Sequence, residues 1–399
     1  MWRQHIIHGV SGLKVALWLY LFLFVAFFDL HAQYPMLSPF ALSLGATPSF
    51  IGLILGVYSI THLPGNIIAG FGVDKYGSKV FIVCSLILAG VVLIIQSYVT
   101  NPWQLLIIRS ISGFVLAFLS PACHALLAKM ARDRIQQGKL MAGNGLVHTI
   151  ASVMSPAAGT FLVAKLGFST SFFILGWLLI MTGILAIVGV KEMKDVFIQE
   201  KLAREYGVPV QSALPDKGYF HIPWLFYGVP LAIACSQGIL YFELPLMEIS
   251  KQSIMTSGIL FSLVSLGSLV TLSMLFLNRL SSFFRLLIGT LSLALIFFGM
   301  AVDWKVPLYV TLFLIGMTKG VIFPAMSTFL ATITSSGRYG RVFSILSVCS
   351  SLGAFFGPIL AGNLRTNLSP YFIAFVGLML ALTILPFNKF RALAAASSS

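Results

Sequence analysis

Charged side chains are scarce in this chain: they make up 9% of its residues, whereas about 25% is typical of soluble domains. Acidic residues are the scarcest, with 11 Asp and Glu against 25 Lys and Arg. Hydrophobic residues make up 58%, and the mean hydropathy is +0.97. Such a chain lacks the polar surface to cover a water-soluble globule, so the sequence predicts an integral membrane protein.

Sequence motifs for metals, nucleotides and catalysis are also lacking. The four cysteines lie in apolar stretches without metal-ligand spacing, so buried, unreactive thiols are expected. Gly70-Phe71-Gly72 begins like a dinucleotide fingerprint but lacks the third glycine in register. The sequence therefore predicts no cofactor and no enzyme. A membrane-embedded enzyme or receptor would be expected to cluster its polar residues at one membrane face, and no such cluster is visible.

The net charge of +14 does not indicate nucleic-acid binding, because the basic residues fall in short loops and form no basic stripe. They gather at both termini and in every second loop between the apolar stretches. The opposite set of loops holds only Lys165, Lys251, Lys305 and Arg365. Basic loops mark the cytoplasmic side, so both termini are predicted to be cytoplasmic and the number of spans even, in the cell membrane.

Twelve apolar segments are long enough for membrane-spanning helices, which need roughly 20 residues. Their predicted limits are 13–35, 49–72, 79–98, 103–128, 140–163, 169–190, 222–246, 254–277, 284–302, 306–333, 341–362 and 369–388.

A polar stretch divides these segments six and six. The predicted organisation is an N-terminal six-helix bundle (1–190), a cytoplasmic linker (191–221), a C-terminal six-helix bundle (222–391) and an appended tail (392–399). The halves repeat weakly, since Ser120-Pro121-Ala122 in the fourth segment parallels Phe323-Pro324-Ala325 in the tenth. Two similar halves in parallel orientation are an internal symmetry of some transporter folds.

A charged segment between the second and third spans holds Gly70, Asp74, Lys75, Gly77 and Lys79. Its spacing resembles the signature loop of the major facilitator superfamily of transporters. The resemblance implies an all-α fold of twelve helices in two pseudo-symmetric bundles that work by alternating access. It also implies that this loop acts as a conformational latch in the outward-open state. A plain orientation signal is the alternative.

Asp29 and Arg109 are expected inside the first and fourth spans, where a charge costs at least about 2.5–3.5 kcal/mol. From the predicted limits they lie roughly 8 Å and 10 Å beyond the midplane. Arg109 followed by Gly113 also resembles the helix-4 motif that the family associates with proton coupling. The two residues are predicted to pair and to open when Asp29 takes a proton, with a static structural pair as the alternative.

Lys319 lies near the middle of the tenth span, far from any acidic residue in the sequence. It is expected to contact substrate, to pair across the cavity with Asp29, or to sit neutral. Gln237, His31 and His62 are further candidates for substrate contact, although a lone membrane histidine is more often a packing residue.

Pro156 and Gly159 lie in Ser155-Pro156-Ala157-Ala158-Gly159-Thr160, which resembles the fifth-helix motif of drug:proton antiporters. Gly357 and Pro358 stand at the corresponding place in the eleventh span. A proline kink with small residues is expected at both places.

The predicted function is proton-coupled export of a small amphiphilic compound by a monomer in the lipid bilayer. Because the membrane interior carries Arg109 and Lys319 against one central acid, a carrier of an organic anion or a charged lipid is the alternative.

Overall fold

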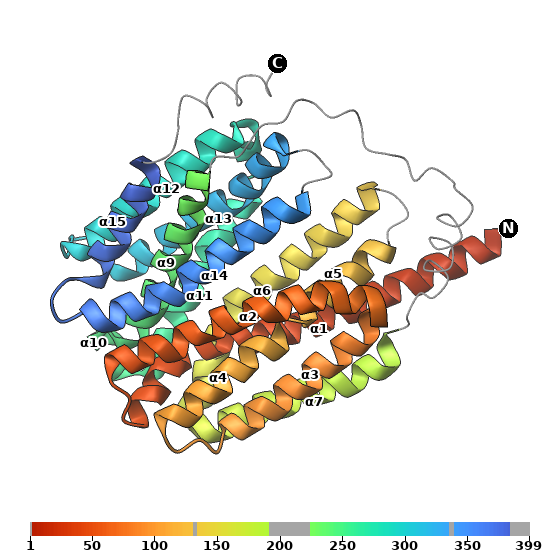
Figure 1. Cartoon of the computed structure of the whole chain (residues 1–399), viewed down its shortest axis with the longest axis horizontal. Coiled ribbons are helices and arrows are strands. Elements are labelled where there is room, and N and C mark those ends of the chain that lie inside the picture. Colours follow the sequence, from red (N-terminus) through yellow and green to blue (C-terminus); the bar gives the residue numbers. More distant parts are fainter. Residues whose placement is uncertain (1, 131–133, 191–223, 335–338, 384–399) are drawn as a thin grey trace. The chain divides into compact units, whose positions relative to one another are not determined.

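Every secondary-structure element in the described residues is a helix. The structure is a computed structural model, and it describes residues 2–130, 134–190, 224–334 and 339–383. The predicted linker 191–221 and tail 392–399 lie outside these ranges. Figure 1 shows the helices α1 (Trp2–Ser43), α2 (Pro48–Tyr76), α3 (Ser78–Gln96), α4 (Pro102–Leu116), α5 (Leu119–Met130), α6 (Arg134–Leu166), α7 (Phe168–Gly189), α9 (Gly228–Glu243), α10 (Glu248–Gln252), α11 (Ile254–Ser273), α12 (Ser282–Ala301), α13 (Leu308–Ile333), α14 (Tyr339–Leu364) and α15 (Pro370–Thr383).

Eleven helices of the described chain are long and apolar enough to cross a membrane. They match the first eleven predicted spans, with α4 and α5 together forming the fourth. The twelfth, α15, is apolar but shorter, and it ends where the described residues end. The predicted all-α membrane fold is thereby confirmed.

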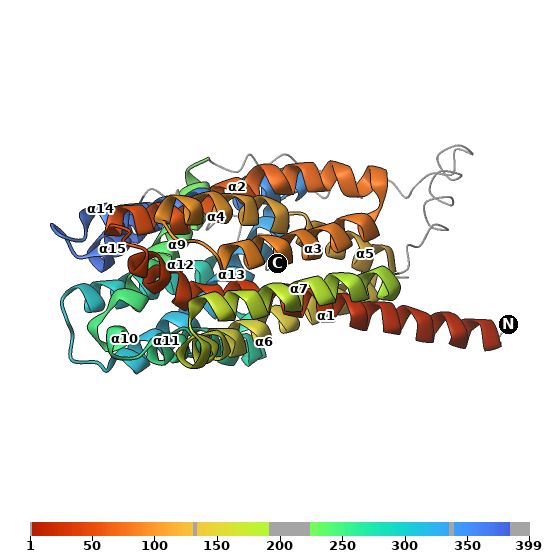
Figure 2. The same cartoon turned by 90° about the horizontal axis from the view of Figure 1, so that it is seen from below.

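The chain packs into two compact units that mix its sequence halves. The first comprises Met1–His31, Thr61–Ser155 and Lys165–Ser212. Within it α3 lies beside α7 and also contacts α4 and α5 (Figures 1 and 2). A methyl group added to Gly90 of α3 would lie 2.6 Å from the carbonyl oxygen of Gly176 on α7, so glycine allows the two backbones to touch.

The second unit comprises Ala32–Ile60, Pro156–Ala164 and Ala213–Ser399. In it α9 packs on α14 and α15, α11 packs on α13, and α12 packs on both α13 and α15. The three stretches from the first half of the chain join these helices through small residues. A methyl group on Gly56 of α2, for example, would lie 2.6 Å from the carbonyl oxygen of Phe355 on α14. The predicted division into 1–190 and 222–391 stays a prediction, because the units reflect packing and not chain order.

The first span runs farther than predicted. It was expected to end at Pro35, but α1 continues through Pro35 and Pro39 to Ser43. Proline is tolerated inside membrane helices, where neighbouring helices and small polar side chains satisfy the freed carbonyls. The apolar span is therefore Val15–Ser43, and Asp29 lies halfway along it. The predicted displacement of Asp29 from the midplane stays a prediction.

The fourth span is interrupted. It was predicted as one segment, 103–128, yet α4 ends at Leu116 and α5 begins at Leu119. Pro121 explains the interruption, because proline lacks an N–H and its ring clashes with the carbonyl four residues earlier. That carbonyl belongs to Ala117, where the helix breaks.

The charged segment between the second and third spans is almost entirely helical. The backbone of α2 continues through Asp74 and Lys75 to Tyr76, and α3 begins two residues later at Ser78. Gly77 alone makes the turn, with a φ of 87° that suits glycine. Asp74 was expected between the second and third spans. It lies instead in the last turn of α2, where the helix dipole does not favour a negative charge.

Candidate functional site

Lys319 lies near the middle of α13 and faces an aromatic ring. Its Nζ is 5.7 Å from the ring centroid of Tyr241 on α9, within the usual range of a cation–π contact. Lys319 and Tyr241 are both half-buried. A half-buried ammonium in the middle of a membrane helix remains available to a ligand, while the ring lowers the cost of its charge.

Tyr241 is the centre of the cluster. Its ring is 4.3 Å from that of Tyr34 on α1 and 5.4 Å from that of Phe261 on α11, measured between centroids. The side-chain amide of Gln237, one helical turn earlier on α9, donates to the Tyr241 hydroxyl. We call Tyr34, Gln237, Tyr241, Phe261 and Lys319 the tyrosine cluster. All five residues belong to the second packing unit.

The tyrosine cluster brings together two residues that the sequence predicted, Gln237 and Lys319. It adds the three rings, which sequence reasoning missed. Tyr241 could have been found, because residues four apart on a helix share a face and Gln237 was already a candidate. Tyr34 could not, because its contact with Tyr241 joins segments that lie 207 residues apart in the chain. The arrangement offers one cation, one amide and flat apolar surfaces, and none of its five members is acidic.

Asp29 and Arg109 are both buried, with 2% of each side chain exposed. Both belong to the first unit. Their places along the two apolar stretches differ. Asp29 is midway along its span, whereas Arg109 lies six residues from the middle of Pro102–Ala128, or about 9 Å along the helix. Their pairing stays a prediction.

Three histidine contacts also lie in the first unit. His62 Nδ1 is 2.8 Å from the side-chain nitrogen of Asn66, one turn later on α2. His124 Nε2 of α5 is 2.7 Å from the side-chain nitrogen of Asn144 on α6. His31 of α1 instead meets another histidine, with its Nε2 3.4 Å from Nε2 of His148 on α6. The substrate contacts predicted for His31 and His62 stay predictions.

The residues expected to kink the fifth and eleventh spans lie where helices touch. They are Pro156, Gly159, Gly357 and Pro358. A methyl group on Gly159 of α6 would lie 2.7 Å from Cβ of Ala32 on α1. A methyl group on Gly258 of α11 would lie 2.5 Å from the carbonyl oxygen of Pro156. On α14, added methyl groups show the same crowding: one on Gly357 would overlap the Cys235 carbonyl. Pro156, Gly159 and Gly357 thus sit at close contacts, and Pro358 abuts Gly52 and Gly238.

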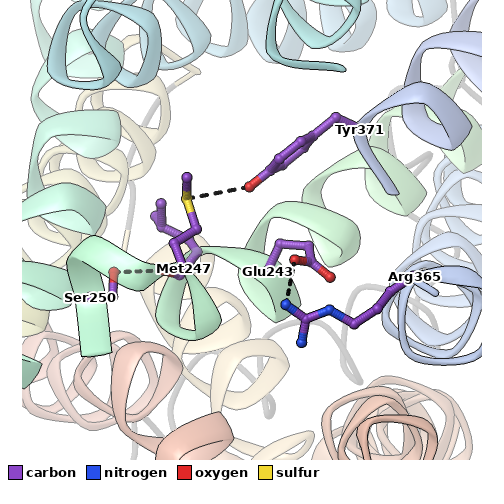
Figure 3. A network of polar contacts seen from close by, with 6 residues as sticks. Glu243, Met247, Ser250, Arg365 and Tyr371 are labelled. Atoms are coloured by element: carbon purple, nitrogen blue, oxygen red, sulfur yellow. Dashed lines mark hydrogen bonds and ion pairs between the residues drawn. The ribbon is translucent and has the colours of Figure 1, made fainter. Parts of the chain in front are cut away.

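An ion pair that sequence reasoning missed lies at the end of α9. The guanidinium of Arg365, just after α14, is 3.4 Å from the carboxylate of Glu243, which is buried (Figure 3). Arg365 also stands 6.0 Å from the Phe242 ring centroid. Nearby, the Tyr371 hydroxyl points at the Met247 sulfur, 3.5 Å away (Figure 3). The Glu243–Arg365 ion pair joins the end of α9 to the residue that follows α14, and each charge compensates the other.

The predicted latch residues are only partly described. Lys75 is exposed, with its Nζ 5.1 Å from the Tyr76 ring centroid, and Lys79 is half-buried. For Gly70 and Asp74 the structure describes only the backbone, as part of α2. The role of the latch stays a prediction.

Comparison with known proteins identifies the family. The family model described as Major Facilitator Superfamily matches residues 19–303, which is more than half of the chain. This chain belongs to the Major Facilitator Superfamily. Such a protein is a multi-span membrane transporter and not an enzyme, and it acts on a small-molecule substrate in a lipid environment.

Several relatives carry the names of efflux pumps. The chain is 24% identical over 353 residues to the "Multi-drug resistance efflux pump PmrA homolog" of Lactococcus lactis, covering 86% of each chain. It is 25% identical over 389 residues to the "Multidrug resistance protein MdtG" of Escherichia coli, covering 94% of each. An "Uncharacterized MFS-type transporter MJ1560" of Methanocaldococcus jannaschii is 30% identical over 163 residues, or 41% of each chain.

Proposed function

We propose that this transporter exports small amphiphilic compounds across the cell membrane in exchange for protons. The observation that carries the proposal is the tyrosine cluster, in which the ring of Tyr241 contacts the rings of Tyr34 and Phe261 and also the ammonium of Lys319 from the middle of α13. Flat apolar surfaces with a few polar groups are typical of sites that bind drug-sized molecules. The names of the efflux relatives support export as the direction.

Asp29 is the proposed proton-binding group, because it is a buried carboxyl midway along a spanning helix. A carboxylate there is expensive, and protonation removes that cost. Arg109 is proposed to adjust the proton affinity of Asp29 through its charge. The protein would act as a monomer with both termini in the cytoplasm, as its basic loops indicate.

Alternating access is supported by the packing of the second unit. Stretches of α2 and α6 contact α14 and α11 through glycines and prolines, and α1 contacts α9 through the rings of Tyr34 and Tyr241. By the distribution of basic loops, these stretches lie toward the external side. We propose that these contacts close the external side and separate when the substrate leaves.

The second candidate is a carrier of an organic anion or a charged lipid. Lys319 favours it, because a cation with no acidic partner in the tyrosine cluster suits an anionic group. The two candidate functions use the same residues but differ in whether protons are coupled and in the charge of the substrate.

The test uses purified protein in liposomes that hold a trapped pH dye. Cationic, neutral and anionic amphiphiles are added in turn. Export by antiport predicts proton movement that starts with the compound and is lost in Asp29→Asn. Asp303→Asn, in an exposed turn, is the matched control and should behave as wild type. Compound movement without proton movement, kept in Asp29→Asn but lost in Lys319→Met, would establish the anion or lipid carrier instead.

A further inference from the structure

Two imidazoles meet tip to tip between α1 and α6. The Nε2 atoms of His31 and His148 are 3.4 Å apart, and the ring planes are nearly perpendicular at 82°. The ring of Phe27, one turn before His31, packs edge-on against His148 at 4.7 Å between centroids. His148 is exposed and His31 half-buried, so one member of the pair faces outward from the protein interior.

The distance between the two nitrogens allows a hydrogen bond whose donor depends on the tautomers of the rings. A neutral imidazole carries one N–H and one bare nitrogen, so a neutral pair can form one hydrogen bond with an Nε2–H on either ring. One added proton turns the donor into an imidazolium, and its bond to the neutral ring becomes charge-assisted and stronger. A second proton would put N–H groups and positive charges on both rings, face to face. The pair therefore accepts one proton and resists a second.

We propose that His31 and His148 form a binding site for a single proton, and that the bound proton strengthens the contact between α1 and α6. The ligand is the proton itself, so the site does not depend on which compound the protein carries. Neither histidine could be assigned this role from sequence, because 117 residues separate them.

The other titratable groups around the pair are engaged or directed elsewhere. On α1, the Tyr20 hydroxyl donates to the carbonyl of Leu140 on α6 at 2.9 Å. Asp29 lies two residues before His31, about 200° around the helix, so its charge can favour the proton without direct contact. On α5, His124 is held by Asn144.

Two lysines of α6 and the helix α7 also belong to the first unit. Lys139 and Lys165 are exposed near the two ends of α6. The helix α7, which packs on α1 through Gly189 against Trp18, has no titratable side chain in its described length.

The test is a pH titration of the purified protein in micelles without any transported compound, with ¹⁵N-labelled histidine imidazoles followed by NMR. Variants assign the signals of the 7 histidines. Two interacting groups titrate in two macroscopic steps, here expected to be separated by more than about one pH unit. In His148→Gln, His31 should titrate in one step, shifted by about one pH unit or more from the first step of the wild type.

The matched control is His124→Gln, which removes a histidine on the neighbouring helix that bonds an amide. It should leave both steps in place. If His148→Gln does not fold, His31→Gln gives the reciprocal measurement on His148. Independent single-step titration of the two histidines in the wild type would overturn the proposal without any variant. Because no compound is present, that result would leave the proposed export function standing.

Discussion

Replacing Lys319 with methionine separates the roles of charge and of volume in the tyrosine cluster. Methionine keeps an unbranched side chain of similar length and removes the ammonium. A hydrogen bond to a charged group contributes about 1.5–3 kcal/mol. Loss of the ammonium should therefore weaken binding of an anionic amphiphile by about 10- to 150-fold. A neutral compound that rests on the rings of Tyr34 and Tyr241 should lose less than about threefold.

The same substitution should stabilise the empty protein. A lysine near the membrane centre costs about 2.5–3.5 kcal/mol, and its contact with the Tyr241 ring returns about 0.5–2 kcal/mol. Lys319→Met should therefore raise the free energy of unfolding by about 0.5–3 kcal/mol.

Binding is measured by calorimetry or fluorescence in detergent, and stability by thermal unfolding of the same samples. Lys305→Met, at an exposed loop position, is the control and should change neither. Equal losses for anionic and neutral compounds, together with unchanged stability, would refute the assignment of Lys319 as a charged ligand contact.

Two further predictions concern packing and the ion pair. Gly316→Ala should lower the free energy of unfolding by about 1–3 kcal/mol, because the methyl group would overlap the carbonyl of Val264. Gly145→Ala is the control, because nothing lies within 4 Å of the added methyl group. Measured by thermal unfolding, it should leave the free energy of unfolding unchanged or raise it by up to about 1 kcal/mol. Glu243→Gln should lower stability by about 1–3 kcal/mol, because it leaves the Arg365 guanidinium without its carboxylate. In a double-mutant cycle, adding Arg365→Gln should recover part of that loss, and strictly additive losses would show that the pair contributes nothing.

The membrane fold was readable from the sequence because it depends on long apolar runs, which are a one-dimensional property. The first eleven spans were found for that reason. Errors arose where a local rule from soluble proteins was applied within the membrane. Pro35 was read as a helix end, although membrane helices continue through proline and α1 runs on to Ser43.

The candidate site was less predictable, because it depends on contacts between distant segments. Lys319 and Gln237 stood out as polar residues in apolar spans, and both proved to be neighbours of Tyr241. Tyr241 itself is one of 12 tyrosines and has no local signal beyond its spacing from Gln237. Glu243 and Arg365 are 122 residues apart in the chain, and only the fold shows that they lie against each other.

Proton coupling through Asp29 is the central claim, and it is tested most directly by separating exchange from net transport in liposomes. Counterflow of labelled against unlabelled compound requires binding and alternating access but no net proton movement. The account predicts that Asp29→Asn retains counterflow and loses accumulation driven by a pH gradient. Accumulation that persists in Asp29→Asn, at the wild-type rate and with the same dependence on the gradient, would contradict it.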